Sequence, residues 1–396
     1  MGLLEPPGGS DDPRRSLGVV YSLPSHERWG RLDGKRVLVR ADLNAPVALV
    51  DGALRVTEDF RLRATVPLLE DLKARGAQVV VCTHFGRPHG EFVEKYRVEP
   101  LRRRLNELCS DVTLLENLRF SPGEEANDPL FGAALIEGFD YYVNEAFGAS
   151  HRAHASIMIP PTLVPSAAGP NLKRETETIL ALLESPARPF LAIVGGAKVR
   201  EKLALVEILA TMADTVIVGG GMAYTFGVAQ GRTIGDSLFD PTFLDACARL
   251  LASERVLIPR DAKGLRTGQA FGSGGDDPVL DFGSDIPEGS MGLDIGPESI
   301  ATFVNAIAQA RTILWNGPMG VFEDPRFASG TEAIARAVAA SEATSVVGGG
   351  DSVAALKSYG LEDHVSFVST GGGASLELVE HGDLPGLKAL RESKWN

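Results

Sequence analysis

The segment 345–356, SVVGGGDSVAAL, places an acid and a hydroxyl directly after three glycines, between an apolar run and a helical pattern. Glycines at such a turn let the backbone approach a ligand, and a helix N-terminus favours negative charge. Because a carboxylate would repel a phosphate there, Asp351 indicates a cation between the two groups, with Ser352 as a further polar contact. The segment, with Gly349 and Gly350 in its turn, predicts a metal–nucleotide loop, although glycine-rich turns in α/β proteins more often serve tight packing.

Two lysines in GGAKVREK also point to phosphate chemistry. Lys198 follows a glycine pair at the start of a predicted helix, and Lys202 comes one turn later, so both ammonium groups lie on one face. The spacing is neither that of a Walker A loop nor that of a dinucleotide fingerprint. Gly371, Gly372 and Gly373 form a second backbone nest able to bind phosphate oxygens.

In the first half of the chain, polar residues follow several predicted strands, a place where loops carry function. Asp42 and Asn44 come directly after the apolar strand 36–40. Comparable positions after other predicted elements are held by His84, Arg87, Arg119, His151, Arg152 and His154. Together they predict a pocket for a small, multiply anionic, hydroxylated molecule. The three histidines lack metal-ligand spacing on a common helix, which disfavours a zinc site.

Arg61 lies in the first turn of a predicted helix over 57–75 if Thr57 is its N-cap. A cation there opposes the helix macrodipole at a cost of about 0.3–1 kcal/mol. This placement indicates a role other than helix stability, with a surface ion pair to Glu58 as the alternative.

The chain shows no H-R-D motif, no G-x-S-x-G motif and no obvious activated nucleophile. A kinase whose acceptor is a hydroxyl usually needs a positioned base, whereas a carboxylate acceptor needs none. Catalysis would then consist of positioning and of charge neutralisation by Arg, Lys, Mg²⁺ and backbone N–H groups.

The elements that would position these residues alternate between apolar strands and helices, which predicts parallel doubly wound sheets with ligand loops at the strand ends. One series has strands near 36–40, 78–82, 112–115 and 141–143, and a polar helix over 171–184 connects it to a second series. That series has strands near 190–194, 215–218, 255–258, 312–314, 345–347 and 365–368. Residues 1–25 are expected to form a disordered extension, and the Gly- and Asp-rich stretch 263–290 a long surface excursion.

Composition excludes several classes of protein. With a net charge of −13, concentrated in the second half, the chain will not bind nucleic acid by bulk charge. No apolar run reaches the roughly 18 residues that span a bilayer, so we expect no membrane association. Three scattered cysteines and the lack of a signal-peptide core favour a reducing, cytoplasmic location without disulfides or a metal cluster.

A series of motifs resembles the phosphoglycerate kinase family in order and spacing, from about residue 25 to the C-terminus. They are RVLVRADLNAP, HFGRP, ENLRF, NEAFGASHRAHAS, GGAKVREK, GGGMAYTF, MGLDIGP, LWNGPMGVFE, GGGDS and STGGGASLELVE. Each motif is modestly specific, and ten in series are highly specific.

The resemblance implies two doubly wound, Rossmann-like α/β domains joined by a hinge helix. The expected division is 26–170 for the substrate domain, 171–185 for the hinge and 186–379 for the nucleotide domain, with 380–396 packing back on the first. It implies a monomer that transfers phosphate between 1,3-bisphosphoglycerate and ADP, giving 3-phosphoglycerate and ATP with Mg²⁺.

The resemblance also implies the residues of the site. The substrate would contact Asp42, Leu43, Asn44, Arg61, His84, Phe85, Gly86, Arg87, Arg119 and Arg152. The Mg-nucleotide would contact Lys198, Lys202, Gly219, Gly220, Gly221, Gly292, Glu323, Gly349, Gly350, Asp351 and Ser352. Asp351 would hold the metal, and the transferring group would lie between Arg61, Lys198 and the amides of Gly371, Gly372 and Gly373.

Small departures from the family pattern leave alternatives open. Glu145 stands where Asp is usual, Ser352 where Thr is common, Phe85 where Leu is common and Ser150 where Ala is usual. A specialised paralogue acting on another phosphorylated carboxylate is one alternative, and a non-catalytic binding relative is another. The second would require the loss of Arg61, Lys198, Lys202 or Asp351, and all four are present.

Overall fold

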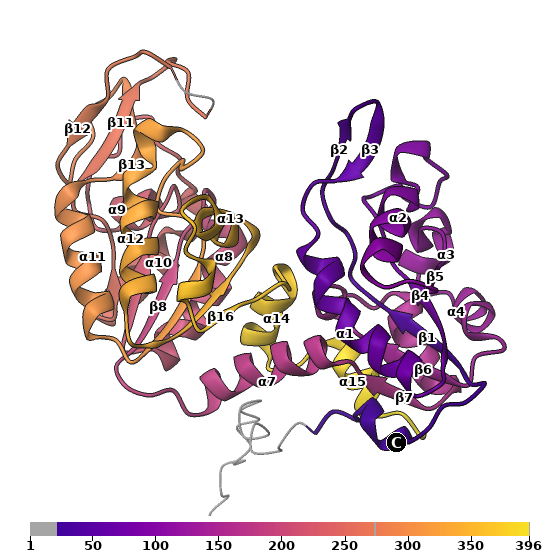
Figure 1. The fold of residues 1–396 in the computed structure, drawn as a ribbon. Helices are drawn as coiled ribbons and strands as arrows, with labels where there is room; N and C mark the ends of the chain where they lie inside the picture. Colours follow the sequence, from indigo (N-terminus) through magenta and orange to yellow (C-terminus); the bar gives the residue numbers. More distant parts are fainter. Residues whose placement is uncertain (1–21, 273–274, 396) are drawn as a thin grey trace, which may run out of the picture.

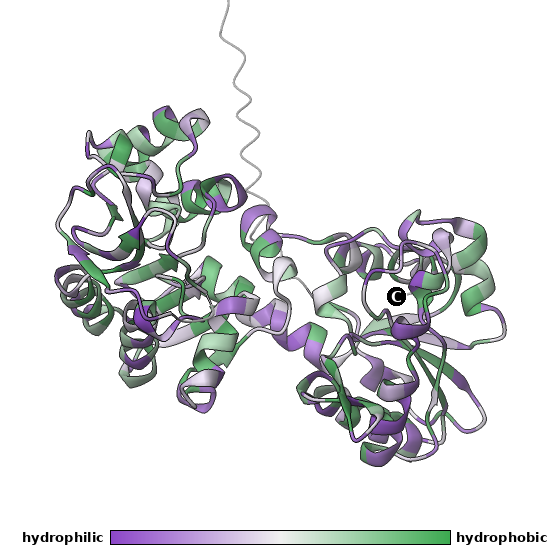
Figure 2. Cartoon of the chain, turned by 90° about the horizontal axis from the view of Figure 1, so that it is seen from above, coloured by the Kyte–Doolittle hydropathy of each residue, from purple (hydrophilic) through white to green (hydrophobic). Residues whose placement is uncertain are grey.

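The computed structural model describes residues 22–272 and 275–395, which form two lobes on either side of the helix α7 (Pro170–Glu184) (Figure 1). Seen from above, the lobes are separate bodies joined through α7, and hydrophobic stretches recur inside each of them (Figure 2). Both lobes are Rossmann-like α/β domains, as the alternation of strands and helices predicts. Among the described residues, no helix is both long and apolar enough to cross a membrane.

The N-terminal lobe is built on a five-stranded parallel sheet in the order β5-β4-β1-β6-β7. Its strands are β1 (Arg36–Arg40), β4 (Gln78–Cys82), β5 (Thr113–Leu114), β6 (Tyr141–Asn144) and β7 (Ser166–Ala168). Its helices are α1 (Phe60–Ala74), α2 (Glu99–Leu108), α3 (Pro122–Glu125), α4 (Pro129–Ile136), α5 (Ala155–Met158) and α6 (Pro160–Leu163). Short 3₁₀ turns are η2 (His26–Trp29), η3 (Glu94–Tyr96), η4 (Leu118–Phe120) and η5 (Phe147–Ala149).

The C-terminal lobe is built on a six-stranded parallel sheet in the order β10-β9-β8-β14-β15-β16. Its strands are β8 (Phe190–Val194), β9 (Thr215–Val218), β10 (Val256–Leu257), β14 (Thr312–Asn316), β15 (Thr344–Gly348) and β16 (Phe367–Val368). Its helices are α8 (Val199–Met212), α9 (Ala223–Ala229), α10 (Leu244–Ala252), α11 (Pro297–Gln309), α12 (Ser329–Ala340), α13 (Gly350–Ser358) and α14 (Gly373–His381). Its 3₁₀ turns are η6 (Pro241–Phe243), η7 (Pro325–Phe327) and η8 (Glu362–His364).

Strands that are buried on both faces form near-continuous apolar runs, as FLAIV in β8 illustrates. Each of the two parallel sheets packs one of its faces into a hydrophobic core of its own lobe. A third core runs from Leu38 and Tyr142 through Leu172 and Ile179 of α7 to Phe190 in the C-terminal lobe. The helix α7 is therefore packed into the core of both lobes and is not a loose linker.

Four sequence expectations need correction. Residues 22–25 were assigned to a disordered extension, but Leu23 is buried and Ser25 bridges to Ala168 at the edge of β7; residues 1–21 lie outside the described part of the chain. Thr57 does not cap α1, because its N–H and hydroxyl bond the carbonyl of Pro46, and Asp59 stands at the N-cap instead.

The other two corrections concern strands. The turn after β1 continues into an antiparallel hairpin of β2 (Val47–Val50) and β3 (Ala53–Val56). Part of the supposed excursion 263–290 belongs to a three-stranded antiparallel sheet of β12 (Leu280–Phe282), β11 (Ala262–Arg266) and β13 (Ser290–Ile295). In 263–290 short strands separated by many glycines give little periodicity, and so the sequence pattern missed them. The hairpin did carry a local signal, the pair Asp51 and Gly52 between two apolar runs, with φ of 50° and 76°.

After α14 the chain returns to the N-terminal lobe, where α15 (Pro385–Arg391) packs against α5, α6 and β7. The hydroxyl of Ser393 donates to the carbonyl of Pro161 at 2.6 Å. Both views place the end of the chain on this lobe (Figures 1 and 2).

Candidate active site

The carboxyl ends of β1 and β4 carry the polar residues that the sequence singled out. The backbone N–H of Leu43 donates to the Thr83 hydroxyl at 3.1 Å, and that of Gly86 donates to Asn44 Oδ1 at 3.0 Å. These bonds fasten the loop after β1 to the loop after β4. The side chains of Leu43 and Phe85 are buried in the hydrophobic core, so only their backbone can meet a ligand.

Arg61, the second residue of α1, forms an ion pair with Asp42 rather than with Glu58. Its other terminal nitrogen donates to the carbonyl of Thr370 at 3.2 Å, so Arg61 reaches across to the C-terminal lobe. Burial raises the pKa of Asp42, but the positive charges of Arg61 and Arg40 and the hydrogen bond from the Asn44 N–H outweigh it and leave that pKa below its usual range. The carboxylate therefore stays ionised and holds the guanidinium in place.

The remaining basic residues of this lobe differ in how firmly they are held. Arg119 is buried, where it donates to the carbonyl of Gly86 at 2.8 Å and pairs with Glu125 at 3.0 Å. Arg152 Nε donates to His151 Nε2 at 3.0 Å, whereas Arg87 is exposed. Burial, with Arg119, Arg40 and Arg152 close by, lowers the pKa of His154 to about 3.

Sequence reasoning missed three side chains beneath this surface, namely Arg40, Glu124 and Ser156. Arg40 and Glu124 are fully buried, and the Ser156 hydroxyl joins them by accepting from Arg40 Nε at 2.9 Å and donating to Glu124 Oε1 at 2.7 Å. The one available signal was a charged residue closing the apolar strand RVLVR. Nothing in the sequence pairs it with a residue 116 positions away.

In the C-terminal lobe, Lys202 is held by backbone and amide oxygens. Its ammonium group donates to the carbonyl of Gly195 at 2.6 Å and to Oδ1 of Asn316 at 2.7 Å. Burial lowers the pKa of Lys202 to about 8, and the nearby carboxylates of Asp351 and Glu201 oppose that shift. Lys198, at the N-cap of α8, is largely exposed and lies 3.6 Å from Glu201.

The GGGDS segment forms the predicted turn between β15 and α13. Gly349 has a positive φ of 87°, and a Cβ added there would lie 2.8 Å from Asn316 Nδ2. A Cβ at Gly350 would meet nothing within 4 Å. Ser352 is buried and its hydroxyl accepts from the N–H of Gly317, whereas Asp351 is exposed in the first turn of α13.

The other glycine loops of this lobe are crowded. At Gly219 an added Cβ would lie 2.4 Å from the sulfur of Met319, and at Gly220 it would lie 2.7 Å from a carbonyl oxygen of the GGAK loop. Gly221 faces that same loop, and Gly292 lies under the Tyr224 hydroxyl. Glu323 is exposed. The GGAK and GGG loops therefore pack against each other and leave no room for side chains.

The loop of Gly371 to Gly373 leads from the C-terminal lobe into α14, which begins at Gly373, and it lies against the N-terminal lobe. A Cβ at Gly371 would be 2.3 Å from the ring of Phe147, and a Cβ at Gly148 would be 3.6 Å from the Cα of Gly371. Glu175 of α7 accepts from the N–H and the hydroxyl of Thr370, both at 2.7 Å. The hinge helix thus fixes this loop beside Arg61, a contact that the sequence did not predict.

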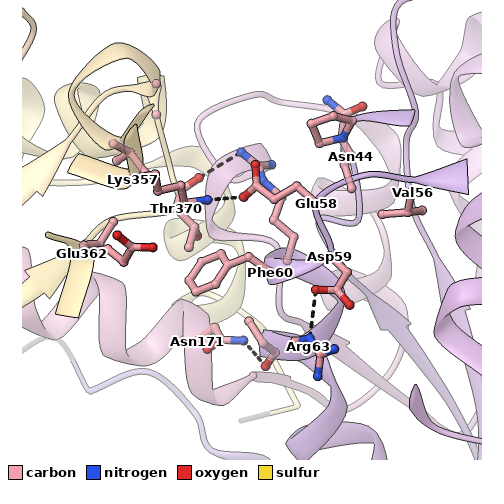
Figure 3. A pocket seen from close by; sticks show the side chains of 18 of the residues that line it. Asn44, Val56, Glu58, Asp59, Phe60, Arg63, Asn171, Lys357, Glu362 and Thr370 are labelled. Carbon is pink, nitrogen blue, oxygen red and sulfur yellow. Dashed lines mark hydrogen bonds and ion pairs between the residues drawn. The ribbon is translucent and has the colours of Figure 1, made fainter. Parts of the chain in front are cut away.

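A cleft of about 1550 Å³ separates the lobes and receives residues from both, including Asn44 and Arg61 from one side and Gly349, Gly350 and Gly372 from the other. Figure 3 shows its wall, where Glu58 and Lys357 face each other across the gap and form an ion pair. Lys357 also lies 5.3 Å from the ring centroid of Phe60. The cleft is thus the space in which ligands of the two lobes would meet.

Two doubly wound lobes that present basic side chains and glycine-rich loops to one cleft define a two-domain phosphotransferase. The family model described as phosphoglycerate kinase matches residues 29–113 and 109–382. The chain belongs to the phosphoglycerate kinase family.

Relatives and solved structures agree with this assignment. The chain is 47% identical over 393 residues to the phosphoglycerate kinase of Rubrobacter xylanophilus, covering 91% of this chain and 96% of that one. It is 45% identical over 390 residues to that of Moorella thermoacetica, covering 91% and 97%. The solved phosphoglycerate kinase of Coxiella burnetii superimposes with a TM-score of 0.84 at 36% identity, covering 94% and 100%. The Pyrococcus horikoshii enzyme gives 0.79 at 29%, covering 94% and 99%.

Proposed function

We propose that the chain catalyses reversible transfer of the acyl phosphate of 1,3-bisphosphoglycerate to ADP, giving 3-phosphoglycerate and ATP. The observation that carries the proposal is the cleft, which has charged side chains of one lobe opposite the glycine loops of the other. Its acceptor in the reverse direction is a carboxylate, which needs no general base.

The N-terminal lobe would hold the phosphoglycerate. Its cationic contacts would come from Arg61, Arg87, Arg119 and Arg152, and its hydroxyl and carboxyl contacts from Asp42, Asn44 and His84, with backbone contacts at Leu43, Phe85 and Gly86. Guanidinium groups bind phosphate and carboxylate through paired hydrogen bonds, which suits a small anionic ligand. The bonds that already fix Arg61 and Arg119 reduce the entropy lost on binding.

The C-terminal lobe would hold the nucleotide on backbone rather than on side chains. The loops of Gly219, Gly220, Gly221 and Gly292 would border the base and ribose with Glu323. Gly349, Gly350, Ser352 and Lys202 would border the phosphates at the N-terminus of α13, which favours anions.

The residues present fit a magnesium ion bound mainly through the nucleotide. Asp351 is an exposed carboxylate that forms no ion pair within residues 22–272 and 275–395, and the same ranges hold no cluster of three or more His, Cys, Asp or Glu ligands. Mg²⁺ commonly takes one or two carboxylates together with substrate phosphates and water. Bound there, the ion would neutralise charge on the phosphates, and Asp351 would fix its place.

Phosphoryl transfer would occur between the lobes. Arg61 from one side, Lys198 from the other and the N–H groups of Gly371, Gly372 and Gly373 would stabilise charge on the moving group. Lys198 is exposed and, among the residues that the structure describes, pairs only with its neighbour Glu201, so its side chain can turn toward the cleft. Closure of the lobes about α7 would exclude water and prevent hydrolysis of the acyl phosphate.

A coupled assay tests the proposal directly. Purified chain is given Mg-ATP with 3-phosphoglycerate or with other phosphorylated carboxylic acids. Turnover with 3-phosphoglycerate at the highest kcat/KM is expected. Turnover confined to another acid would point to a specialised paralogue, and none with any acid would refute the proposal.

The role of Asp351 is tested by calorimetry of ADP binding with and without Mg²⁺. Asp351→Ala should weaken Mg-ADP binding at least about tenfold and leave metal-free ADP binding unchanged. Equal affinities in both conditions would refute the ligand assignment. Asp281→Ala, a change to an exposed acid of β12 outside the cleft lining, serves as the control.

We further propose that the chain works as a cytoplasmic monomer without nucleic acid or membrane partners. The predicted boundaries 26–170, 171–185, 186–379 and 380–396 stay part of this proposal. Light scattering at assay concentration tests the oligomeric state.

A further inference from the structure

His84 lies at the carboxyl end of β4 and is almost fully buried, with 8% of its surface exposed. Its ring nitrogen Nδ1 lies 3.1 Å from Nη2 of the fully buried Arg40 on the neighbouring strand β1. A guanidinium group has only donors and keeps its proton at all accessible pH values. Nδ1 must therefore accept this hydrogen bond and carry no proton.

With Nδ1 unprotonated, the neutral ring carries its proton on Nε2. Within the described part of the chain, no hydrogen bond to Nε2 is present, which leaves its N–H available to a ligand. A neutral donor at this place can bind a hydroxyl or carboxylate oxygen.

Arg40 is itself held by two further bonds. Nη1 donates to the carbonyl of Ala41 at 2.6 Å, and Nε donates to the hydroxyl of Ser156 at 2.9 Å. The Ser156 hydroxyl donates a hydrogen bond to Glu124 Oε1 at 2.7 Å, and the Ser156 N–H donates to Glu124 Oε2 at 2.9 Å. A chain of hydrogen bonds therefore runs from the buried carboxylate of Glu124 through Ser156 and Arg40 to His84.

The charges around His84 act in the same direction as this geometry. Burial lowers the pKa of His84 well below its usual range; Asp42 opposes the shift, and Arg40, Arg119 and Arg61 reinforce it. These groups come from β1, the loop after it, η4 and α1. An imidazolium in this place would face three guanidinium groups, and only one carboxylate would offset them.

We propose that Arg40 is a positioning residue that fixes His84 as the neutral tautomer with its proton on Nε2, and that Glu124 anchors Arg40 through the Ser156 hydroxyl. The inference rests on the proposed binding of 3-phosphoglycerate beside His84. Arg40 acts through the ring and not by touching the substrate. Its effect is to present one uncharged donor of fixed direction among the cationic contacts of the pocket.

The tautomer is tested first on the unaltered protein, by NMR of the full chain with ¹⁵N-labelled histidine. Couplings between the ring protons and the two nitrogens should identify His84 with a protonated Nε2 and a bare Nδ1, unchanged from pH 8 to pH 5.5. A proton on Nδ1, or titration within this range, would overturn the proposal. Addition of 3-phosphoglycerate should shift the Nε2 signal. No shift would overturn the placement of the substrate at His84, which is a failure of the proposed function and not of the tautomer.

The positioning role is tested by Arg40→Met. Loss of the guanidinium removes the donor to Nδ1, while burial, Arg119 and Arg61 still keep the ring neutral, so the NMR spectrum should show both neutral tautomers of His84. At pH 8 the KM for 3-phosphoglycerate should rise about tenfold, the value of one hydrogen bond to a charged group, with a smaller change in kcat.

A matched control and a second variant keep the test decisive. Arg36→Met makes the same change at the exposed start of β1, where Arg36 lies over the ring of Phe139, and should alter neither the His84 signals nor KM. Ser156→Ala keeps Arg40 but cuts its link to Glu124, and should give a smaller share of the Nδ1-protonated tautomer and a smaller rise in KM. If Arg40→Met does not fold, Ser156→Ala and the wild-type spectrum decide. A spectrum of Arg40→Met that still shows only the Nε2 proton on His84 would mean a purely structural role and overturn the proposal.

Discussion

In the proposed function, the two walls of the cleft would recognise anions by different means. On the N-terminal side the candidate contacts are side chains. Beneath them lie the hydrogen-bonded Arg40, Ser156 and Glu124, and Arg119 is buried beside them. On the C-terminal side, crowded glycine loops expose backbone, and Lys202 is the deeply held cation of the candidate site. A small acid has few polar groups, so each protein side chain that binds it must be held in the right orientation. A nucleotide is large, and a cradle of backbone suits its phosphates.

This difference sets how each wall responds to change. In a network of buried charges, loss of one member leaves its partner unsatisfied, so damage spreads to neighbours. In a glycine cradle, removal of a side chain is impossible and addition of one is the only perturbation. The first wall should thus be sensitive to truncation and pH, and the second to added bulk.

The largest effect is expected at Arg61, the point where the walls touch. Arg61→Ala removes a donor near the moving phosphoryl group and should lower kcat by about 10²–10³-fold, the usual cost of one charge-stabilising donor. The affinity for Mg-ADP, measured by calorimetry, should change by less than about twofold, which is about 0.4 kcal/mol of binding free energy. Arg63→Ala, two residues along at an exposed position paired with Asp59, is the control. An unaltered kcat in Arg61→Ala would mean that the contact to Thr370 is only structural.

Acid should weaken the N-terminal wall more than the other. The pKa of His154 is lowered to about 3 in the folded chain from an ordinary 6.5, so only the unfolded chain takes up this proton in between. The free energy of unfolding therefore falls as pH drops from 6.5 toward 3, by up to about 1.4 kcal/mol per pH unit from this group. His154→Asn should lose about 2 kcal/mol less than wild type between pH 6 and 4, by urea titration. Equal losses would contradict this, and His381→Asn, at an exposed site, should match wild type.

Added bulk should damage the C-terminal wall. Gly220→Ala places a Cβ 2.7 Å from a backbone oxygen at a residue with a φ of 67°. The loop should lose about 1–2 kcal/mol of stability from the strained backbone alone, and ADP binding should weaken in addition. Gly360→Ala has nearly the same φ, 66°, with nothing within 4 Å of the added Cβ, so it isolates the strain. Equal effects of both changes on ADP binding would show that crowding in the cradle does not matter.

The smallest effect is expected for the ion pair between the walls. Lys357→Met removes its bond to Glu58 but keeps an apolar side chain over Phe60. Because the pair is partly exposed, stability should change by less than about 1 kcal/mol. If the pair biases the lobes toward each other, small-angle scattering should show a larger radius of gyration in Lys357→Met. An identical scattering curve would mean that this contact does not influence the opening.

Most of the framework could be predicted from the sequence, because apolar strands and strand-end loops are local patterns. The strands β1, β4, β8 and β9 lie where their β-branched runs predict, and Asn44 after β1 lines the cleft between the lobes. Long-range pairing could not be predicted in this way. Arg40 meets His84 because β1 and β4 are neighbours, and Glu175 meets Thr370 because α7 passes under the last glycine loop.

The return of α15 to the N-terminal lobe has a consequence for the order in which the molecule is made. Ser393 bonds Pro161 across 232 positions, and Leu387 and Leu390 are fully buried on this lobe. Synthesis starts at the N-terminus, and domains usually fold as they emerge. Here the N-terminal lobe lacks α15 until that helix leaves the ribosome, which happens after the whole C-terminal lobe has been made. The N-terminal lobe is thus begun first but completed last. A chain cut short before Pro385 would expose an apolar surface on the N-terminal lobe.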